Sequence, residues 1–143
     1  MKTRSRARGW ALQILYAREA RGESESLAAI LDEFIAHRRI RPASLDYLRR
    51  LVTTIDAHTD GIDRSLDASL HNWKLNRLSA IDRNVLRVGA AELLFHPDVP
   101  ARAAIQEAIL LAEKYGTAES PRFVNGVLDG VMRAAGTASG ETH

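Results

Sequence analysis

Residues 79–97, SAIDRNVLRVGAAELLFHP, carry a helical pattern with a recognisable start and end. Ser79 and Asp82 have the spacing of a helix capping box, so a helix is predicted to begin at Ser79. Pro97 cannot continue it, and the helix must end before that residue. The apolar residues between these limits recur at helical spacing and form one core-facing stripe: Ile81, Val85, Leu86, Leu93 and Leu94.

The same periodicity extends in both directions from this segment. Apolar side chains recur at three- and four-residue intervals along residues 7–15, 27–35, 45–70, 104–112 and 123–131. No stretch alternates apolar and polar residues as a half-buried strand would. The pattern predicts an all-α protein, a compact bundle of about six to seven helices.

Proline and glycine mark the ends of the predicted helices. Gly22 follows the first helix, Pro42 and Pro100 suit the first turns of later ones, and Ser120-Pro121 reads as an N-cap with a first-turn proline. The apolar pattern of residues 45–70 runs past Gly61, which predicts either one long helix or two helices with a bend.

Length and composition bound the class of protein. With 143 residues the chain is expected to form a single domain over residues 1–135, followed by a frayed polar tail over 136–143. The absence of cysteine excludes disulfides, thiolate metal sites and a cysteine nucleophile. No apolar run approaches the ~18 residues of a membrane helix, and no secretory signal is recognisable, so a cytoplasmic protein without a membrane partner is expected.

Motifs of enzyme chemistry do not occur. The five histidines lie in separate segments, and no nucleophile elbow, phosphate-binding glycine loop or dinucleotide fingerprint is present. Asp60, Asp63 and Asp67 recur on one helical face with Arg64 between them, a spacing that predicts a solvated surface. We therefore expect no catalytic residues, metal, cofactor or small-molecule substrate.

The first 21 residues are strongly basic although the net charge of the chain is only +2. Glu19 is the only acid among these basic residues: Lys2, Arg4, Arg6, Arg8, Arg18 and Arg21. On a helix, Lys2, Arg6, Gln13 and Tyr16 share the face opposite the apolar stripe. Cations, an amide and an aromatic ring are the groups that bind single-stranded RNA, although a basic face can also serve only solubility.

Arg4 and Arg8 fall at the border of the apolar stripe of this first helix. In that position each side chain can either lie along the protein surface or reach the same ligand.

Several short motifs together resemble the NusB family of transcription antitermination factors. They occur in the order of that family and cover the chain from Arg4 to about Val131. The motifs are Arg4-x-x-x-Arg8-x-x-Ala11-Leu12-Gln13-x-Leu15-Tyr16, then Trp73-x-x-x-Arg77-Leu78-x-x-Ile81-Asp82-Arg83-x-x-Leu86-Arg87, Glu92-Leu93, Val99-Pro100, Glu107-Ala108 and Ser120-x-x-Phe123-Val124-Asn125-Gly126-Val127-Leu128-Asp129.

The resemblance implies two helical subdomains and a function without bond chemistry. Such a protein binds the boxA element of nascent RNA jointly with ribosomal protein NusE, within the RNA polymerase antitermination complex, chiefly in ribosomal RNA operons. It implies two groups of RNA-binding residues, on the first and last helices: Lys2, Arg4, Arg6, Arg8, Gln13 and Tyr16, and Glu119, Ser120, Arg122 and Phe123. The helix start predicted at Ser120 is also suited to bind a phosphate.

Asp82 is the candidate NusE contact, because a ribosomal protein is expected to be basic, although this residue can equally serve only to cap its helix. The sequence is also compatible with two other functions. NusB-like modules also precede the catalytic domain of ribosomal RNA cytosine methyltransferases, for which a chain ending at His143 would leave no room. A helical adaptor that binds no RNA is expected if the basic face is only solvated.

Overall fold

A computed structural model describes residues 2–22 and 24–140, with the side chains of residues 2 and 137–140 left out of the description. Seven α-helices and one 3₁₀ helix occur in these ranges, without a strand, which confirms the all-α prediction. The elements are α1 (Lys2–Ala20), α2 (Leu27–Ala36), α3 (Pro42–Ala57), α4 (Thr59–Ser69), η1 (Leu75–Arg77), α5 (Ala80–Phe95), α6 (Ala101–Tyr115) and α7 (Ser120–Gly140).

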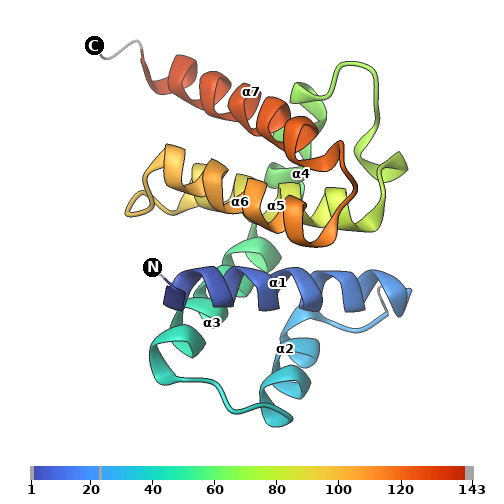
Figure 1. The fold of residues 1–143 in the computed structure, drawn as a ribbon, viewed down its shortest axis with the longest axis vertical. Coiled ribbons are helices and arrows are strands. Elements are labelled where there is room, and N and C mark those ends of the chain that lie inside the picture. The colour runs from blue at the N-terminus through green and yellow to red at the C-terminus, as the bar shows by residue number, and fades with distance from the viewer. Residues whose placement is uncertain (1, 23, 141–143) are drawn as a thin grey trace.

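The helices form two groups that share α5. In Figure 1, α1, α2 and α3 occupy the lower half of the molecule, and α7 lies at the top beside α4. Helix α5 contacts α1 and α3 on one side and α6 and α7 on the other. This arrangement agrees with the two subdomains that the resemblance implied. No helix in the described part of the chain is long and apolar enough to cross a membrane.

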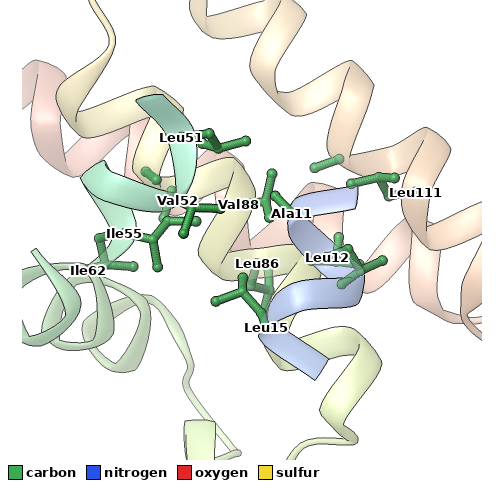
Figure 2. Packing of buried hydrophobic residues seen from close by; sticks show 14 of the residues in the cluster. Ala11, Leu12, Leu15, Leu51, Val52, Ile55, Ile62, Leu86, Val88 and Leu111 are labelled. Carbon is green, nitrogen blue, oxygen red and sulfur yellow. The ribbon is translucent and has the colours of Figure 1, made fainter. Parts of the chain in front are cut away.

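The predicted apolar stripes meet in one hydrophobic core. Figure 2 shows Leu15 of α1, Ile55 of α3 and Leu86 of α5 converging between the three helices. Each of these side chains is fully buried, which removes its apolar surface from water and stabilises the fold. The core fixes the orientation of α1, because burial of Ala7 and Ala11 turns the opposite face of that helix outward.

Most helix ends lie where the sequence predicts them. Gly22 adopts a left-handed conformation (φ 77°) just after α1, and α5 ends at Phe95, two residues before Pro97. The Ser79 hydroxyl accepts a hydrogen bond from the backbone N–H of Asp82 at 3.1 Å, as expected of an N-cap. The region of residues 45–70 forms two helices, which are separated at His58, so the second of the two alternatives holds.

Two carboxylates of α4 contact neighbouring elements. Asp63 pairs with Arg87 of α5 at 3.0 Å, and an Asp67 oxygen accepts a hydrogen bond from the backbone N–H of Leu75 at 3.1 Å. Asp60, Arg64 and Asp67 are exposed, as a solvated face requires, whereas Asp63 is half-buried. At the C-terminus, α7 continues to Gly140, whereas fraying over residues 136–143 stays a prediction.

Candidate nucleic-acid interface

The outward face of α1 carries three of the predicted RNA-binding residues. Arg6, Gln13 and Tyr16 are exposed, and the tyrosine side chain keeps 47% of its surface accessible. This exposure argues against a core role for Tyr16. The side chain of Lys2, which the sequence places on the same face, lies outside the described residues.

A groove separates this face of α1 from the second half of α6. It has a volume of about 450 Å³, and its walls include Arg6 and Gln13 from α1 and Lys114 and Tyr115 from α6. Gln13 and Tyr16 also line a neighbouring groove of about 360 Å³, to which Tyr115 contributes again. The structure therefore joins a guanidinium, an amide and two phenol rings on one surface.

Lys114 and Tyr115 were not predicted as site residues. Their position in the last turn of α6 suggested only the end of a helix, where a basic residue is favourable. In the structure the Lys114 ammonium lies 5.3 Å from the centroid of the Tyr115 ring, and both residues face α1 across the groove. Their contribution depends on tertiary packing, which helical periodicity does not reveal.

Arg8 does not belong to the exposed face. Only 5% of this residue is accessible, and its Nε atom donates to both carboxylate oxygens of the buried Glu92, at 2.9 and 2.8 Å. A second guanidinium nitrogen lies 3.2 Å from Glu107. The structure therefore does not present Arg8 as an exposed contact for RNA: its partner Glu92 is buried, and Glu107 is partly exposed at the α1–α6 groove.

Buried polar groups of α3 and α5 complete this ion pair. The Tyr47 hydroxyl donates a short hydrogen bond to Glu92 and lies 2.9 Å from Nδ1 of His96. Burial, together with the hydrogen bond to Glu92, raises the pKa of Tyr47 well above its usual range. Burial and the nearby charge of Arg50 lower the pKa of His96 to about 4, so its ring is neutral at physiological pH.

Arg4 remains at the surface but is already paired. Its guanidinium lies 4.5 Å from the centroid of the Tyr47 ring and 3.0 Å from Asp98. Arg50 also binds Asp98, and the two arginines hold the pKa of that carboxyl well below its usual range. An RNA phosphate that binds Arg4 must therefore compete with Asp98.

The start of α7 differs in detail from the predicted cap. Ser120 is the first residue of the helix, is 1% accessible, and accepts a hydrogen bond from the Thr117 N–H through its hydroxyl at 2.9 Å. A side chain at Gly116 would collide with Ser120, which explains the glycine there. The Ser120 hydroxyl is thus buried and engaged within the fold, and a contact between this residue and RNA stays a prediction.

The other predicted residues at this end are accessible. Glu119 precedes α7, and its carbonyl accepts a hydrogen bond from the Phe123 N–H at 3.1 Å, the bond expected at the N-cap position. Glu119 and Arg122 are exposed and Phe123 is half-buried. Four residues, 116–119, join α6 to α7, so the helix start lies close in sequence to Tyr115 at the edge of the groove.

Asp82 lies half-buried in the first turn of α5. Its Oδ1 atom is buried and has no hydrogen-bond partner within the described residues. The helix cap uses the backbone N–H of Asp82 and the Ser79 hydroxyl. A role of the Asp82 carboxylate in binding NusE stays a prediction. The described ranges also contain no cluster of three or more histidine or acidic residues able to hold a metal ion.

Comparison with known proteins places these features in a family. The sequence profile of the NusB family matches residues 5–133. Transcription antitermination protein NusB of Nocardioides sp. is 44% identical over 93% of this chain and 96% of its own length. The corresponding protein of Myxococcus xanthus is 39% identical over 94% of this chain and 97% of its own.

Solved structures give the same result. NusB of T. maritima superimposes with a TM-score of 0.84 at 38% identity, covering 91% of this chain and 90% of that one. A chain from the crystal structure of the antitermination factors NusB and NusE in complex with double-stranded RNA gives a TM-score of 0.82 at 30% identity, over 94% and 98% of the two chains. The chain therefore belongs to the NusB family.

Proposed function

We propose that this chain is a cytoplasmic transcription antitermination factor that binds boxA RNA of nascent transcripts together with ribosomal protein NusE. The observation that carries this proposal is the exposed face of Arg6, Gln13 and Tyr16 beside the α1–α6 groove. Its close relatives are named as antitermination proteins, and a similar chain was crystallised with NusE and RNA. The function requires binding and no bond chemistry.

The proposed RNA surface follows the accessible residues of α1 and of the start of α7. It comprises Arg4, Arg6, Gln13, Tyr16, Glu119, Arg122 and Phe123, to which the groove adds Lys114 and Tyr115. Lys2 is included from its place in the sequence, because its side chain lies outside the described residues. Arginine and lysine bind the phosphates, and the aromatic rings stack on bases. Asp82 at the start of α5 is the proposed contact for NusE.

Titration of fluorescently labelled boxA RNA tests this function. We expect saturable binding that is weaker for a scrambled RNA of equal length, and stronger when purified NusE is present. Equal affinity for the boxA and scrambled RNAs, with and without NusE, would contradict the proposal. Lack of RNA binding in a folded protein would support a helical adaptor instead.

Replacing Arg6 by alanine is expected to weaken RNA binding and to reduce its salt dependence. Arg6 is exposed and, within the described residues, pairs with no carboxylate. Loss of one phosphate contact should lower the slope of log K against log salt by ~0.7 for single-stranded RNA. Affinities measured at several salt concentrations check this prediction.

Arg133→Ala is the control for Arg6→Ala. Arg133 is a 77% accessible arginine that lies 13 residues beyond the start of α7, and it pairs with Asp129 of the same helix at 3.0 Å. Both variants should melt at the temperature of the parent. If Arg6→Ala retains the salt slope of the parent, then Arg6 does not contact the RNA backbone.

Glu119→Gln is expected to tighten RNA binding. The Glu119 carboxylate stabilises the positive end of α7 in the free protein, but it repels a phosphate approaching the same end. Removing the charge while keeping the shape should improve affinity by ~0.3–1 kcal/mol, at a similar small cost in stability. RNA titrations and thermal melts of the variant measure both effects. Weaker binding would show that Glu119 itself contacts the RNA.

A further inference from the structure

A second group of accessible cations lies in the connection between α2 and α3, and we call it the arginine loop: Arg38, Arg39 and Arg41. All three side chains are exposed, whereas Ile40 between them is half-buried and packs against the hydrophobic core. This contact anchors the loop to the fold. The arginines are therefore held at the surface rather than carried on an unattached segment.

The charges of the arginine loop are not neutralised within the described residues. No carboxylate there pairs with any of the three guanidinium groups, and the two acids of the neighbouring α2 are engaged elsewhere. Asp32 lies 3.8 Å from Arg49, and Glu33 binds Arg21 at 2.6 Å. The Arg38 guanidinium is held 4.0 Å from the centroid of the Phe34 ring, a stacking contact that leaves its charge uncompensated.

The N-terminal end of α3 adds positive electrostatic potential to that of the arginine loop. Arg41 occupies the N-cap position without a side-chain cap, Pro42 is the first helical residue, and the first turn contains no acid. The helix start therefore presents unpaired backbone N–H groups beside a guanidinium. Helix N-termini are ordinarily stabilised by negative groups, so a cation here is unfavourable in the free protein and favours binding of an anion.

This helix start lies against the beginning of α1. The Ser44 hydroxyl of α3 donates a hydrogen bond to the backbone carbonyl of Thr3 at 3.2 Å, and the Arg4 guanidinium lies over the Tyr47 ring. The first turn of α1 also lacks an acidic residue. Two positive helix ends thus meet, and Figure 1 shows the N-terminal end of α1 beside α3.

The acids of this region do not pair with the free cations of the junction. Asp98 is shared between Arg4 and Arg50. Glu107 binds Ser5 and Arg8. Asp46 in the second turn of α3 is exposed and pairs with no cation within the described residues, and Arg6 and Arg41 have no carboxylate partner there. The N-terminal end of α1, which carries Arg6 beside the α1–α6 groove, therefore lies close to the helix start at which the arginine loop ends.

We propose that the arginine loop binds the phosphates of RNA that flanks the boxA element. This inference rests on the proposed function and extends its footprint beyond the α1–α6 groove. Guanidinium groups and free backbone N–H groups bind phosphate independently of base identity, so the loop would add affinity without sequence preference. RNA longer than the element itself would then bind more tightly than the element alone.

The test compares three labelled RNAs: boxA alone, boxA with six extra nucleotides at its 5′ end, and boxA with six at its 3′ end. Each is titrated at several salt concentrations with the full chain, with Arg39→Ala/Arg41→Ala, and with the control Arg64→Ala/Arg133→Ala. The control removes the same charge from exposed positions on α4 and α7, in the other half of the molecule.

We expect one of the two extended RNAs to bind the full chain on the order of tenfold more tightly than boxA alone, as two added phosphate contacts allow. The loop variant should lose this gain, with a salt slope lower by about 1.4 on the extended RNA. Its affinity for boxA alone and its melting temperature should match those of the parent, and the control should keep the gain.

Two results would overturn the proposal: neither extension improves affinity, or the loop variant keeps the full improvement. These outcomes are distinct from failure of the proposed function. If the full chain binds boxA alone, the function stands whatever the extensions do. If the full chain does not bind boxA alone, both the function and this extension of it are rejected.

Discussion

Arg8→Ala is expected to lower the free energy of unfolding by about 3–5 kcal/mol, the usual cost of removing one partner of a buried ion pair. The reason is that Glu92, which is 1% accessible, would lose both guanidinium hydrogen bonds and its buried counter-charge. Tyr47 would remain as a neutral donor to that carboxylate. Urea denaturation of the parent and the variant measures the change.

The double variant Arg8→Ala/Glu92→Gln separates the two origins of this cost. Because it removes the uncompensated charge as well, it should be more stable than Arg8→Ala alone, a sign of direct coupling between the residues. If Arg8→Ala has the same free energy of unfolding as the parent but binds RNA poorly, then Arg8 contacts RNA. Its ion pair with Glu92 would then not be a stabilising contact of the fold.

Tyr16→Ala should weaken RNA binding by ~1–3 kcal/mol, which is the range for loss of one base-stacking ring. The salt slope should remain that of the parent, because the phenol ring carries no charge. Nearly half of the Tyr16 side chain is accessible, so its removal should change stability far less than the loss of a buried aromatic residue.

Tyr16→Phe is the matched control, because it keeps the ring and removes only the hydroxyl. We expect it to retain most of the RNA affinity. A Tyr16→Ala variant with lowered melting temperature and unchanged RNA affinity would assign this residue to packing in the groove that it lines with Leu12 and Ile81.

The sequence predicts those features that depend on local chemistry. Proline and glycine limit the helices because neither fits a helix interior, and the structure ends α5 just before Pro97. Helical spacing from the buried Ala7 and Ala11 placed Arg6, Gln13 and Tyr16 on the outward face. Each of these predictions requires only the geometry of one helix.

The remaining features depend on contacts between distant segments. The border position of Arg8 on α1 was ambiguous, and its partner Glu92 lies 84 residues away. Lys114 becomes part of the groove only because α6 packs beside α1. The break at His58 has no glycine or proline to mark it, and the imidazole ring stacks on Phe95 of α5, 3.9 Å between centroids.

RNA is expected to bind the outward face of α1 and the adjoining start of α7. Amide chemical shifts of isotope-labelled protein, followed while unlabelled boxA RNA is added, report the binding surface residue by residue. We expect the largest changes in residues 4–16 and 114–123, with Tyr16 among the most affected. Changes confined to the connection between α4 and α5 around the exposed Trp73, with α1 unaffected, would contradict this expectation.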